Sequence, residues 1–241
     1  NGYHTLSRTT DKARESNQRG SITSVYEYVP VTDVDSADAL QRFGYVKVEA
    51  TSFTISEPVE TLEVSPLLYS EATGEQRQIL ESAYGVKPFP VQTIKMERIF
   101  ADKILAAEFY YQRRMLFDTA KHLYDLAIMM EQERIRTLLS TPEELTAMLA
   151  YKRKEERERI GSDLSEKPFS EFTLFYAVGT DDELKAAFLK MQEIYVFSQR
   201  DILSPVQLSE SMEALNQALL QLDEGLERTQ ASSEQTQQKM L

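Results

Sequence analysis

The stretch that decides the fold reads Glu97-Arg98-Ile99-Phe100-Ala101-Asp102-Lys103-Ile104-Leu105-Ala106-Ala107-Glu108-Phe109-Tyr110-Tyr111. If this stretch is a helix, the nearest neighbours of Lys103 lie three and four residues away, and one more lies a further turn on. Those neighbours are all apolar or aromatic: Ile99, Phe100, Ala106, Ala107 and Tyr110. In such surroundings an ammonium group loses hydration, which only a carboxylate, a phosphate or a route to water can replace. The pattern therefore predicts that Lys103 meets an anion.

A second helix is predicted over residues 118–130, and its pattern complements the first. It carries four ionisable side chains, which are Asp118, Lys121, His122 and Asp125. Spacing by one turn favours a pair between Lys121 and Asp125, contributing roughly 0.2–0.5 kcal/mol, and a second pair between His122 and Asp118. Because the two helices form a hairpin, Asp125 is alternatively placed to orient Lys103. We therefore expect a polar site where the helices cross.

The N-terminal part of the chain is predicted to form strands. Residues 23–31, 43–55, 60–64 and 89–96 have strand patterns, residues 74–84 form a helix that ends at Gly85, and residues 1–22 have the polar composition of a loop. In the second strand apolar residues alternate with polar ones, Val46, Val48 and Ala50 with Lys47, Glu49 and Thr51. Glu49 therefore points away from the apolar face, toward either water or a site.

After Met130 the pattern is almost wholly helical. Helices are predicted over residues 132–139, 141–159, 180–200 and 207–226, the second of which begins at Thr141-Pro142 and ends at Gly161. Residues 171–178 fit a strand or a helix. The Gln and Ser bias from Thr229 onward predicts a disordered tail. The chain thus divides into a sheet region over residues 1–95, a helical hairpin over 96–140, a helical region over 141–228 and a tail over 229–241.

Composition limits the class of protein. A chain of 241 residues, 41% hydrophobic and 10% aromatic, can bury a sizeable core in one or two domains. The sequence contains no signal peptide and no apolar run long enough to span a membrane, and it has no cysteine, so we expect a cytoplasmic protein without membrane contact. The net charge of −12 argues against a protein that coats nucleic acid non-specifically. His4 and His122 are too few for a histidine-rich metal site.

Basic and aromatic groups elsewhere leave alternatives open. Residues 152–159 interleave Lys and Arg with Glu, which favours a solvated face joined by ion pairs over an RNA-binding strip. Arg113 and Arg114 are placed to contact a phosphate backbone or to stabilise the end of their helix. Phe109, Tyr110 and Tyr111 are interpreted as core residues, with stacking of a base as the alternative.

Several segments, taken in order, give the chain a resemblance to a known family. They are Val25-Tyr26-Glu27-Tyr28, Tyr45-Val46-Lys47-Val48-Glu49-Ala50-Thr51-Ser52, Tyr84-Gly85-Val86-Lys87-Pro88-Phe89-Pro90-Val91, Met96-Glu97-Arg98-Ile99-Phe100-Ala101-Asp102-Lys103 and Ala120-Lys121-His122-Leu123-Tyr124-Asp125-Leu126. Over residues 24–140 the chain resembles the AbiEii/AbiGii-type nucleotidyltransferase toxins of bacterial toxin–antitoxin and phage-defence systems. The resemblance implies an α+β fold, in which a small antiparallel sheet fragment of a nucleotidyltransferase-like fold is followed by a helical C-terminal domain.

The resemblance also implies roles for single residues. Glu49 matches an acidic ligand of Mg²⁺, Lys103 faces the phosphates of a nucleoside triphosphate with Lys121 nearby, and Asp125 completes the catalytic site. The implied chemistry is transfer of nucleotides from the triphosphate to an acceptor, which in related toxins is commonly RNA, including the tRNA 3′ end. A cognate antitoxin is the implied partner protein. The structural alternative for Lys103 is a buried ion pair with Glu49, Glu97 or Asp125.

The family's other signature is a glycine turn followed by an Asp-x-Asp pair, which supplies two more metal-binding carboxylates. Gly20-Ser21 and Asp33-Val34-Asp35 mimic its spacing, but the residues between them have a strand pattern where the family has a helix. We therefore expect the signature before Asn1, in a longer protein of which this chain is the C-terminal part. One carboxylate holds Mg²⁺ weakly, so we expect little catalysis by this part alone. The competing hypothesis is a non-catalytic scaffold whose helices from Thr141 onward bind an antitoxin or another protein.

Overall fold

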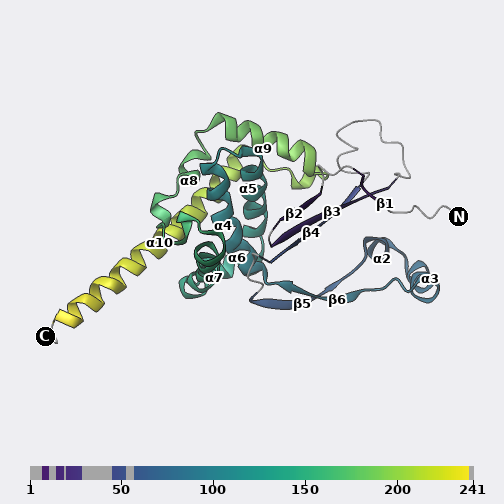
Figure 1. The fold of residues 1–241 in the computed structure, drawn as a ribbon, viewed down its shortest axis with the longest axis horizontal. Coiled ribbons are helices and arrows are strands. Elements are labelled where there is room, and N and C mark those ends of the chain that lie inside the picture. Colours follow the sequence, from purple (N-terminus) through teal and green to yellow (C-terminus); the bar gives the residue numbers. More distant parts are fainter. Residues whose placement is uncertain (1–6, 11–14, 19, 29–44, 53–56, 239–241) are drawn as a thin grey trace.

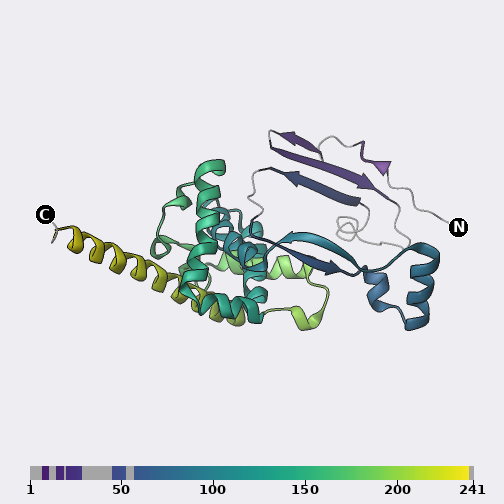
Figure 2. The ribbon, with the colours of Figure 1, turned by 90° about the horizontal axis from the view of Figure 1, so that it is seen from below.

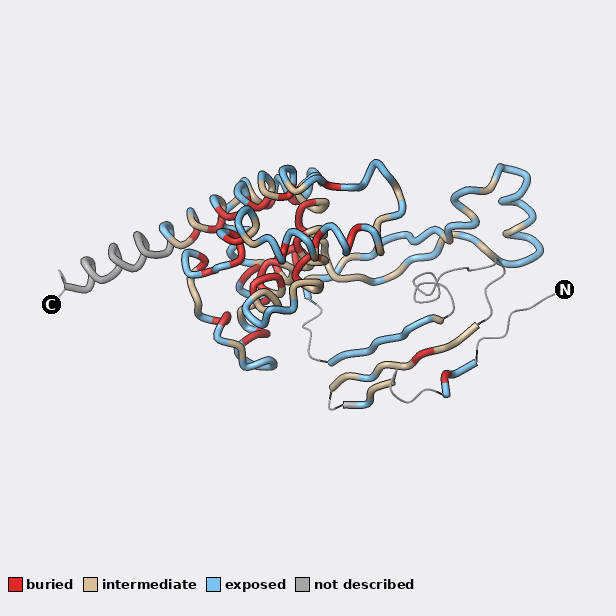
Figure 3. The backbone as a smooth tube through the Cα atoms, turned by 90° about the horizontal axis from the view of Figure 1, so that it is seen from above, coloured by how far each residue is buried: buried red, intermediate tan, exposed pale blue. Residues whose placement is uncertain are grey.

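The computed structural model describes residues 7–10, 15–18, 20–28, 45–52 and 57–238, and gives only the backbone for Gln18 and for residues 226–238. It has the predicted α+β class, with antiparallel strands on one side and a helical body on the other (Figure 1). Buried residues gather in the helical body, whereas strand residues are mostly exposed or of intermediate burial (Figure 3). Within the ranges that the structure describes, no helix is both long enough and apolar enough to cross a membrane.

The larger sheet is built around β3 (Ser21–Glu27). β4 (Tyr45–Thr51) pairs antiparallel along one edge of β3, with Glu49 opposite Thr23, and β1 (Ser7–Arg8) and β2 (Ser16–Gln18) share the other edge. The prediction of a loop over residues 1–22 is therefore wrong where these short strands lie, because backbone pairing with β3 outweighs their polar composition. Val46 and Val48, on the apolar side of β4, are 44% and 51% exposed.

A long hairpin follows the larger sheet along the chain. Its strands are β5 (Val59–Val64) and β6 (Phe89–Ile94), and the helices α2 (Leu67–Glu71) and α3 (Gly74–Tyr84) lie at its far end, away from the body (Figure 2). A capping box between Thr73 and Gln76 begins α3, and Gly85 ends it with a φ of 65°. The predicted boundaries of this helix are confirmed.

Arg134 fixes the hairpin to the helical body. Its guanidinium donates two hydrogen bonds to Glu60 on β5, at 3.0 and 3.1 Å, and two to Glu97 at the start of the next helix, at 2.8 and 2.9 Å. These carboxylates raise the pKa of Arg134. Because planar, paired hydrogen bonds constrain direction as well as distance, Arg134 is a directional link between β5 and the start of α4.

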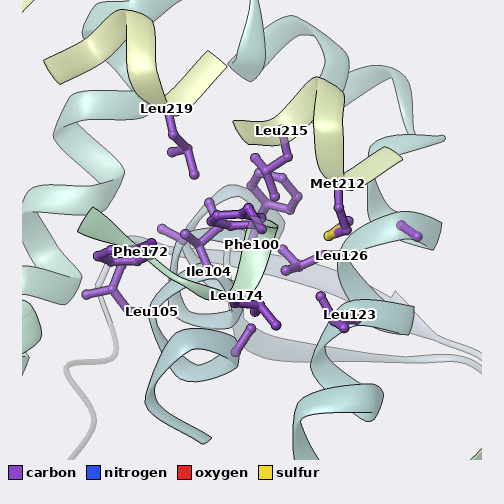
Figure 4. Close-up of a cluster of buried hydrophobic side chains, with 14 of the residues drawn as sticks. Phe100, Ile104, Leu105, Leu123, Leu126, Phe172, Leu174, Met212, Leu215 and Leu219 are labelled. Carbon is purple, nitrogen blue, oxygen red and sulfur yellow. The ribbon is translucent and has the colours of Figure 1, made fainter. Parts of the chain in front are cut away.

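The helical body begins with the antiparallel helices α4 (Met96–Gln112) and α5 (Leu116–Met130). It continues with α6 (Glu133–Leu139), α7 (Pro142–Glu155), α8 (Leu174–Ala177), α9 (Asp182–Tyr195) and α10 (Pro205–Gln238). Apolar side chains of these helices and of the turn before α8 form one core, in which Phe100, Ile104, Leu126, Phe172 and Leu215 have no exposed surface (Figure 4). Each such side chain contributes about 1.5–3 kcal/mol, so the body holds most of the apolar stabilisation.

The C-terminal helices follow the predicted order with local differences. α7 continues as a π-helical turn over Glu156–Ile160 and stops at Gly161, whose φ of 71° suits glycine. Residues 171–178, where strand and helix were alternatives, contain the end of a 3₁₀ turn (Phe169–Glu171) and then α8. The backbone of α10 is helical through Gln238, past Thr229 where a disordered tail was expected. That part of the chain is rich in helix formers and has no Gly or Pro after Gly225.

Charged side chains join α4 to α7 inside the body. Arg98 has no exposed surface and pairs with Asp102 and with Glu155, whose Oε2 is 3.2 Å from Nη2. Lys152 Nζ lies 2.7 Å from Glu155 and 2.8 Å from Glu156. Burial lowers the pKa of Arg98, and Glu155 opposes that effect. The expectation of a solvated face is therefore wrong for Lys152, Glu155 and Glu156, because α4 packs over them.

Candidate functional site

The candidate site lies along the hairpin of α4 and α5, which pack against each other over their length. A tight turn joins them, with Arg114 in the left-handed region at a φ of 55°. Facing the core, α4 buries Phe100, Ile104 and Ala107, while α5 buries Leu123 and Leu126. The side chains that do not face the core include a row of polar groups.

We call this row the polar strip. It consists of Lys103 on α4 and Asp118, Lys121, His122 and Asp125 on α5, all of intermediate burial. On α5 these residues recur at helical spacing, so they share one side of the helix. The polar strip lies where the sequence predicts a polar site.

Lys103 and Asp125 meet across the two helices. Nζ of Lys103 lies 2.6 Å from Oδ2 of Asp125, and the two side chains are 27% and 42% exposed. Of the three carboxylates considered for Lys103, Asp125 is the partner, since Glu97 binds Arg134 and Glu49 binds Lys47. An ammonium group has three N–H donors. Within the described residues Lys103 uses one of them, so donors remain for a further anion.

His122 stacks on Tyr110 of α4, with ring centroids 5.2 Å apart and an interplanar angle of 19°. Burial lowers the pKa of His122 to about 4, and the Lys103 ammonium acts in the same direction, while the carboxylates of Asp125 and Asp118 oppose it. The imidazole is therefore neutral at pH 7. The expected pair with Asp118 does not form. Among the described residues, the buried Nδ1 of His122 has no hydrogen-bond partner.

Lys121 pairs with Asp118, at 3.1 Å between Nζ and Oδ1, and not with Asp125 as expected. The reason is that Asp125 is already bound by Lys103 from the opposite helix. Nζ of Lys121 also lies 5.0 Å from the ring centroid of Phe117 and 5.3 Å from that of Tyr195. Both distances are within the range of cation–π attraction. Two ammonium groups thus lie along the strip, each held by one carboxylate.

Glu49 is not brought to this strip by any ion pair or hydrogen bond of the described residues. Its carboxylate lies on the polar side of β4, 2.7 Å from Nζ of Lys47, and its side chain is 62% exposed. Magnesium prefers octahedral oxygen coordination, and the described ranges contain no group of three or more His, Asp or Glu side chains that could hold a metal. The described residues therefore do not form a Mg²⁺ site.

The segment that mimics the family's acidic signature is partly visible. Gly20 has a φ of 82°, and β3 follows it directly, so the strand expected after Gly20-Ser21 is present. Asp33 and Asp35 lie outside the described residues. That they only mimic the spacing of the Asp-x-Asp pair therefore stays a prediction.

The other basic and aromatic candidates have structural partners. Arg114 pairs with Asp181 at 2.7 Å and with Glu183, and Tyr111 donates a hydrogen bond to Asp181 at 3.0 Å. The guanidinium of Arg113 lies 3.5 Å from the ring centroid of Phe109. Sequence reasoning missed Phe117 and Tyr195 beside Lys121. No local pattern marks Tyr195, because α9 joins α5 only through tertiary packing. Phe117 lies one turn before Lys121 on α5, and this spacing could have found it.

The strip combines anchored ammonium groups, a neutral imidazole and partly open surface. Such an arrangement suits recognition of phosphate, since the Lys103 ammonium can bind a phosphate oxygen in place of the Asp125 carboxylate or together with it. A family model described as nucleotidyl transferase AbiEii toxin, type IV TA system, matches residues 4–231. No curated protein and no solved structure matches the chain.

Proposed function

Because the chain belongs to the AbiEii family of nucleotidyl transferase toxins of type IV toxin–antitoxin systems, we propose that it acts in nucleotide transfer from a nucleoside triphosphate to RNA. The observation that supports this most directly is the Lys103–Asp125 pair. It joins two helices, stays partly exposed, and leaves ammonium donors for a phosphate.

In this proposal Lys103 binds the triphosphate, Asp125 holds the Lys103 ammonium in position, and Lys121 adds a second positive charge from α5, the helix that carries Asp125. Phosphoryl transfer relies on positioning and on charge stabilisation. A lysine anchored by a carboxylate provides both, because its side chain is already ordered when the substrate arrives. Magnesium accompanies the triphosphate, and Glu49 is its candidate ligand from this chain. No step assigned here to Lys103, Asp125 or Lys121 depends on the metal.

The acceptor, the location and the partner are proposed by analogy with the same family. An RNA acceptor, including the tRNA 3′ end, requires a cytoplasmic location, where triphosphates and RNA occur together. The antitoxin is the partner that limits the toxin. The acceptor is tested by incubating the complete gene product with an α-labelled triphosphate and total RNA. Label in RNA supports the proposal, whereas label in protein alone removes the RNA acceptor from it.

The role of Lys103 is tested with Lys103→Met and a matched control, Lys190→Met. Lys190 is also paired with a carboxylate, that of Glu193 at 3.3 Å, but on an exposed part of α9. We expect Lys103→Met to weaken triphosphate binding at least about tenfold, in keeping with loss of a charge-assisted bond. Stability should change by less than about 1 kcal/mol, because the pair is partly exposed. Lys190→Met should change neither quantity.

Two results would remove the proposal. The first is a wild-type protein that binds no nucleoside triphosphate in the presence of magnesium. The second is a Lys103→Met variant that binds the triphosphate as tightly as wild type but has a lower free energy of unfolding. The Lys103–Asp125 pair would then stabilise the fold without binding the substrate. Calorimetric titration and urea denaturation of the same samples separate these cases.

A further inference from the structure

The polar strip ends in aromatic rings from two helices. Phe117 lies on α5 one turn before Lys121, and Tyr195 is the last residue of α9. Their ring centroids are 6.0 Å apart with an interplanar angle of 51°. Nζ of Lys121 lies near both rings, at 5.0 and 5.3 Å from the centroids. A cation and two aromatic rings therefore form one cluster beside His122.

Tyr195 presents open aromatic surface at this place. The residue is 51% exposed, and within the described residues its hydroxyl makes no hydrogen bond. The aromatic residues nearer the helix turn differ, because Tyr110 is covered by His122, Phe109 by Arg113, and Tyr111 is bound to Asp181. Because the hydroxyl of Tyr195 has no hydrogen-bond partner among the described residues, a second flat group can cover the exposed part of this ring without breaking a hydrogen bond to it.

The ring also lies close to the phosphate-binding groups of the proposed function. Lys121 is one turn from Asp125 on α5, which places their Cβ atoms about 5–6 Å apart. Both Lys103 and Lys121 lower the pKa of His122, so both ammonium groups act electrostatically on this imidazole. Phosphate and base are joined by one sugar in any nucleotide. A nucleotide on the strip therefore meets cations and an aromatic surface together.

We infer that Tyr195, supported by Phe117 and Lys121, is a stacking subsite for a nucleobase. The inference rests on the proposed function, because it takes the phosphates of the same ligand to lie at Lys103. The base belongs either to the triphosphate or to the end of a single-stranded RNA acceptor. Stacking on an aromatic ring suits both, since every base has a π face.

The test uses Tyr195→Ala, Tyr195→Phe and a matched control, Tyr176→Ala. Tyr176 is a tyrosine of α8 with similar exposure, 57%, and takes no part in the strip. The probes are the four nucleoside triphosphates, inorganic triphosphate, which has phosphates but no base, and a fluorescein-labelled single-stranded RNA. Binding is measured by calorimetry for the small probes and by fluorescence anisotropy for the RNA.

Loss of one stacked base should weaken binding about 5- to 150-fold in Tyr195→Ala. If the base is that of the substrate, the triphosphates lose affinity while inorganic triphosphate does not. If the base is that of the acceptor, the RNA loses affinity while the triphosphates do not. In both cases Tyr195→Phe keeps the ring and should bind within about threefold of wild type, and Tyr176→Ala should match wild type.

Unchanged binding of triphosphates and RNA by Tyr195→Ala overturns the subsite and leaves the proposed function intact, provided that Lys103→Met still weakens triphosphate binding. Equal loss of inorganic triphosphate also overturns it, because the effect would then not concern a base. A wild-type protein that binds neither triphosphate nor RNA overturns both the subsite and the proposed function.

Discussion

Replacing Glu108 by alanine tests how α4, the helix that carries Lys103, is held in the body. Glu108 has no exposed surface. Its carboxylate accepts hydrogen bonds from the backbone N–H groups of Thr173, at 3.0 and 3.1 Å, and Leu174, at 2.9 Å, and from Oγ1 of Thr173 at 3.1 Å. Nε2 of Gln112 donates a further bond at 2.8 Å. A side chain of α4 thus satisfies donors at the start of α8 that the helix itself cannot satisfy.

The expected loss of stability depends on whether each hydrogen-bond donor can reach water when Glu108 is absent. The N–H of Leu174 stays buried, and a buried unsatisfied donor costs about 1–3 kcal/mol. Thr173 is an exposed residue, so its donors regain water and the loss is nearer the net value of about 1 kcal/mol. Together these give about 2–4 kcal/mol for Glu108→Ala. Glu108→Gln keeps one oxygen but turns an amide N–H toward a donor, and we expect about half that loss.

The assay is urea denaturation followed by far-ultraviolet circular dichroism, with equal slopes required for comparison. Gln112→Ala is the matched control, because it removes one bond to the same carboxylate from an exposed side chain and should cost less than about 1 kcal/mol. If the free energy of unfolding of Glu108→Ala is within about 0.5 kcal/mol of that of wild type, the carboxylate does not hold α8, and the reasoning from buried donors is refuted.

Three further changes test other parts of the molecule. The pKa of His122 falls from 6.5 to about 4 on folding, so between these pH values the unfolded chain binds more protons than the folded protein. Stability is therefore lost as the pH falls from 6.5 toward 4, and His122→Gln should remove up to about 3 kcal/mol of this pH dependence. A wild-type imidazole of His122 that titrates near pH 6.5 by NMR would contradict this prediction. Arg98→Ala should destabilise the protein by about 3–5 kcal/mol, because it leaves Glu155 buried with one cation fewer, and urea denaturation should show part of this loss recovered by adding Glu155→Leu. Arg134→Ala should cost less than about 1 kcal/mol, since its side chain is 41% exposed, yet it should speed amide hydrogen exchange in β5; unchanged exchange there would mean that Glu60 does not anchor the hairpin.

Local pattern predicted the elements well where capping and turn residues were explicit. Gly85 and Gly161 end their helices as predicted, because a positive φ angle depends on the residue itself. The same reasoning failed for the short strands over residues 7–8 and 16–18. Their pairing depends on the edge of β3, which no neighbour in the sequence reveals.

Ion pairs were predicted less well than elements. Lys121 has a carboxylate one turn away on either side, Asp118 and Asp125, and spacing alone does not choose between them. The choice was made by Lys103, which takes Asp125 from the other helix. The burial of Lys152 has the same origin, because the packing of α4 against α7 converts a sequence of surface type into a buried network.

The sequence by itself determined the α+β class, the order of helices, the family resemblance that the match over residues 4–231 confirmed, and the presence of a lysine that needs an anion. These depend on residue type and on short-range spacing, which are fixed before the chain folds. Tertiary structure alone decided which acid meets Lys103, why His122 is neutral, and that Tyr195 joins Lys121. Those outcomes depend on how whole helices cross, because a charge or a ring far along the chain reaches the site only after the core between them has packed.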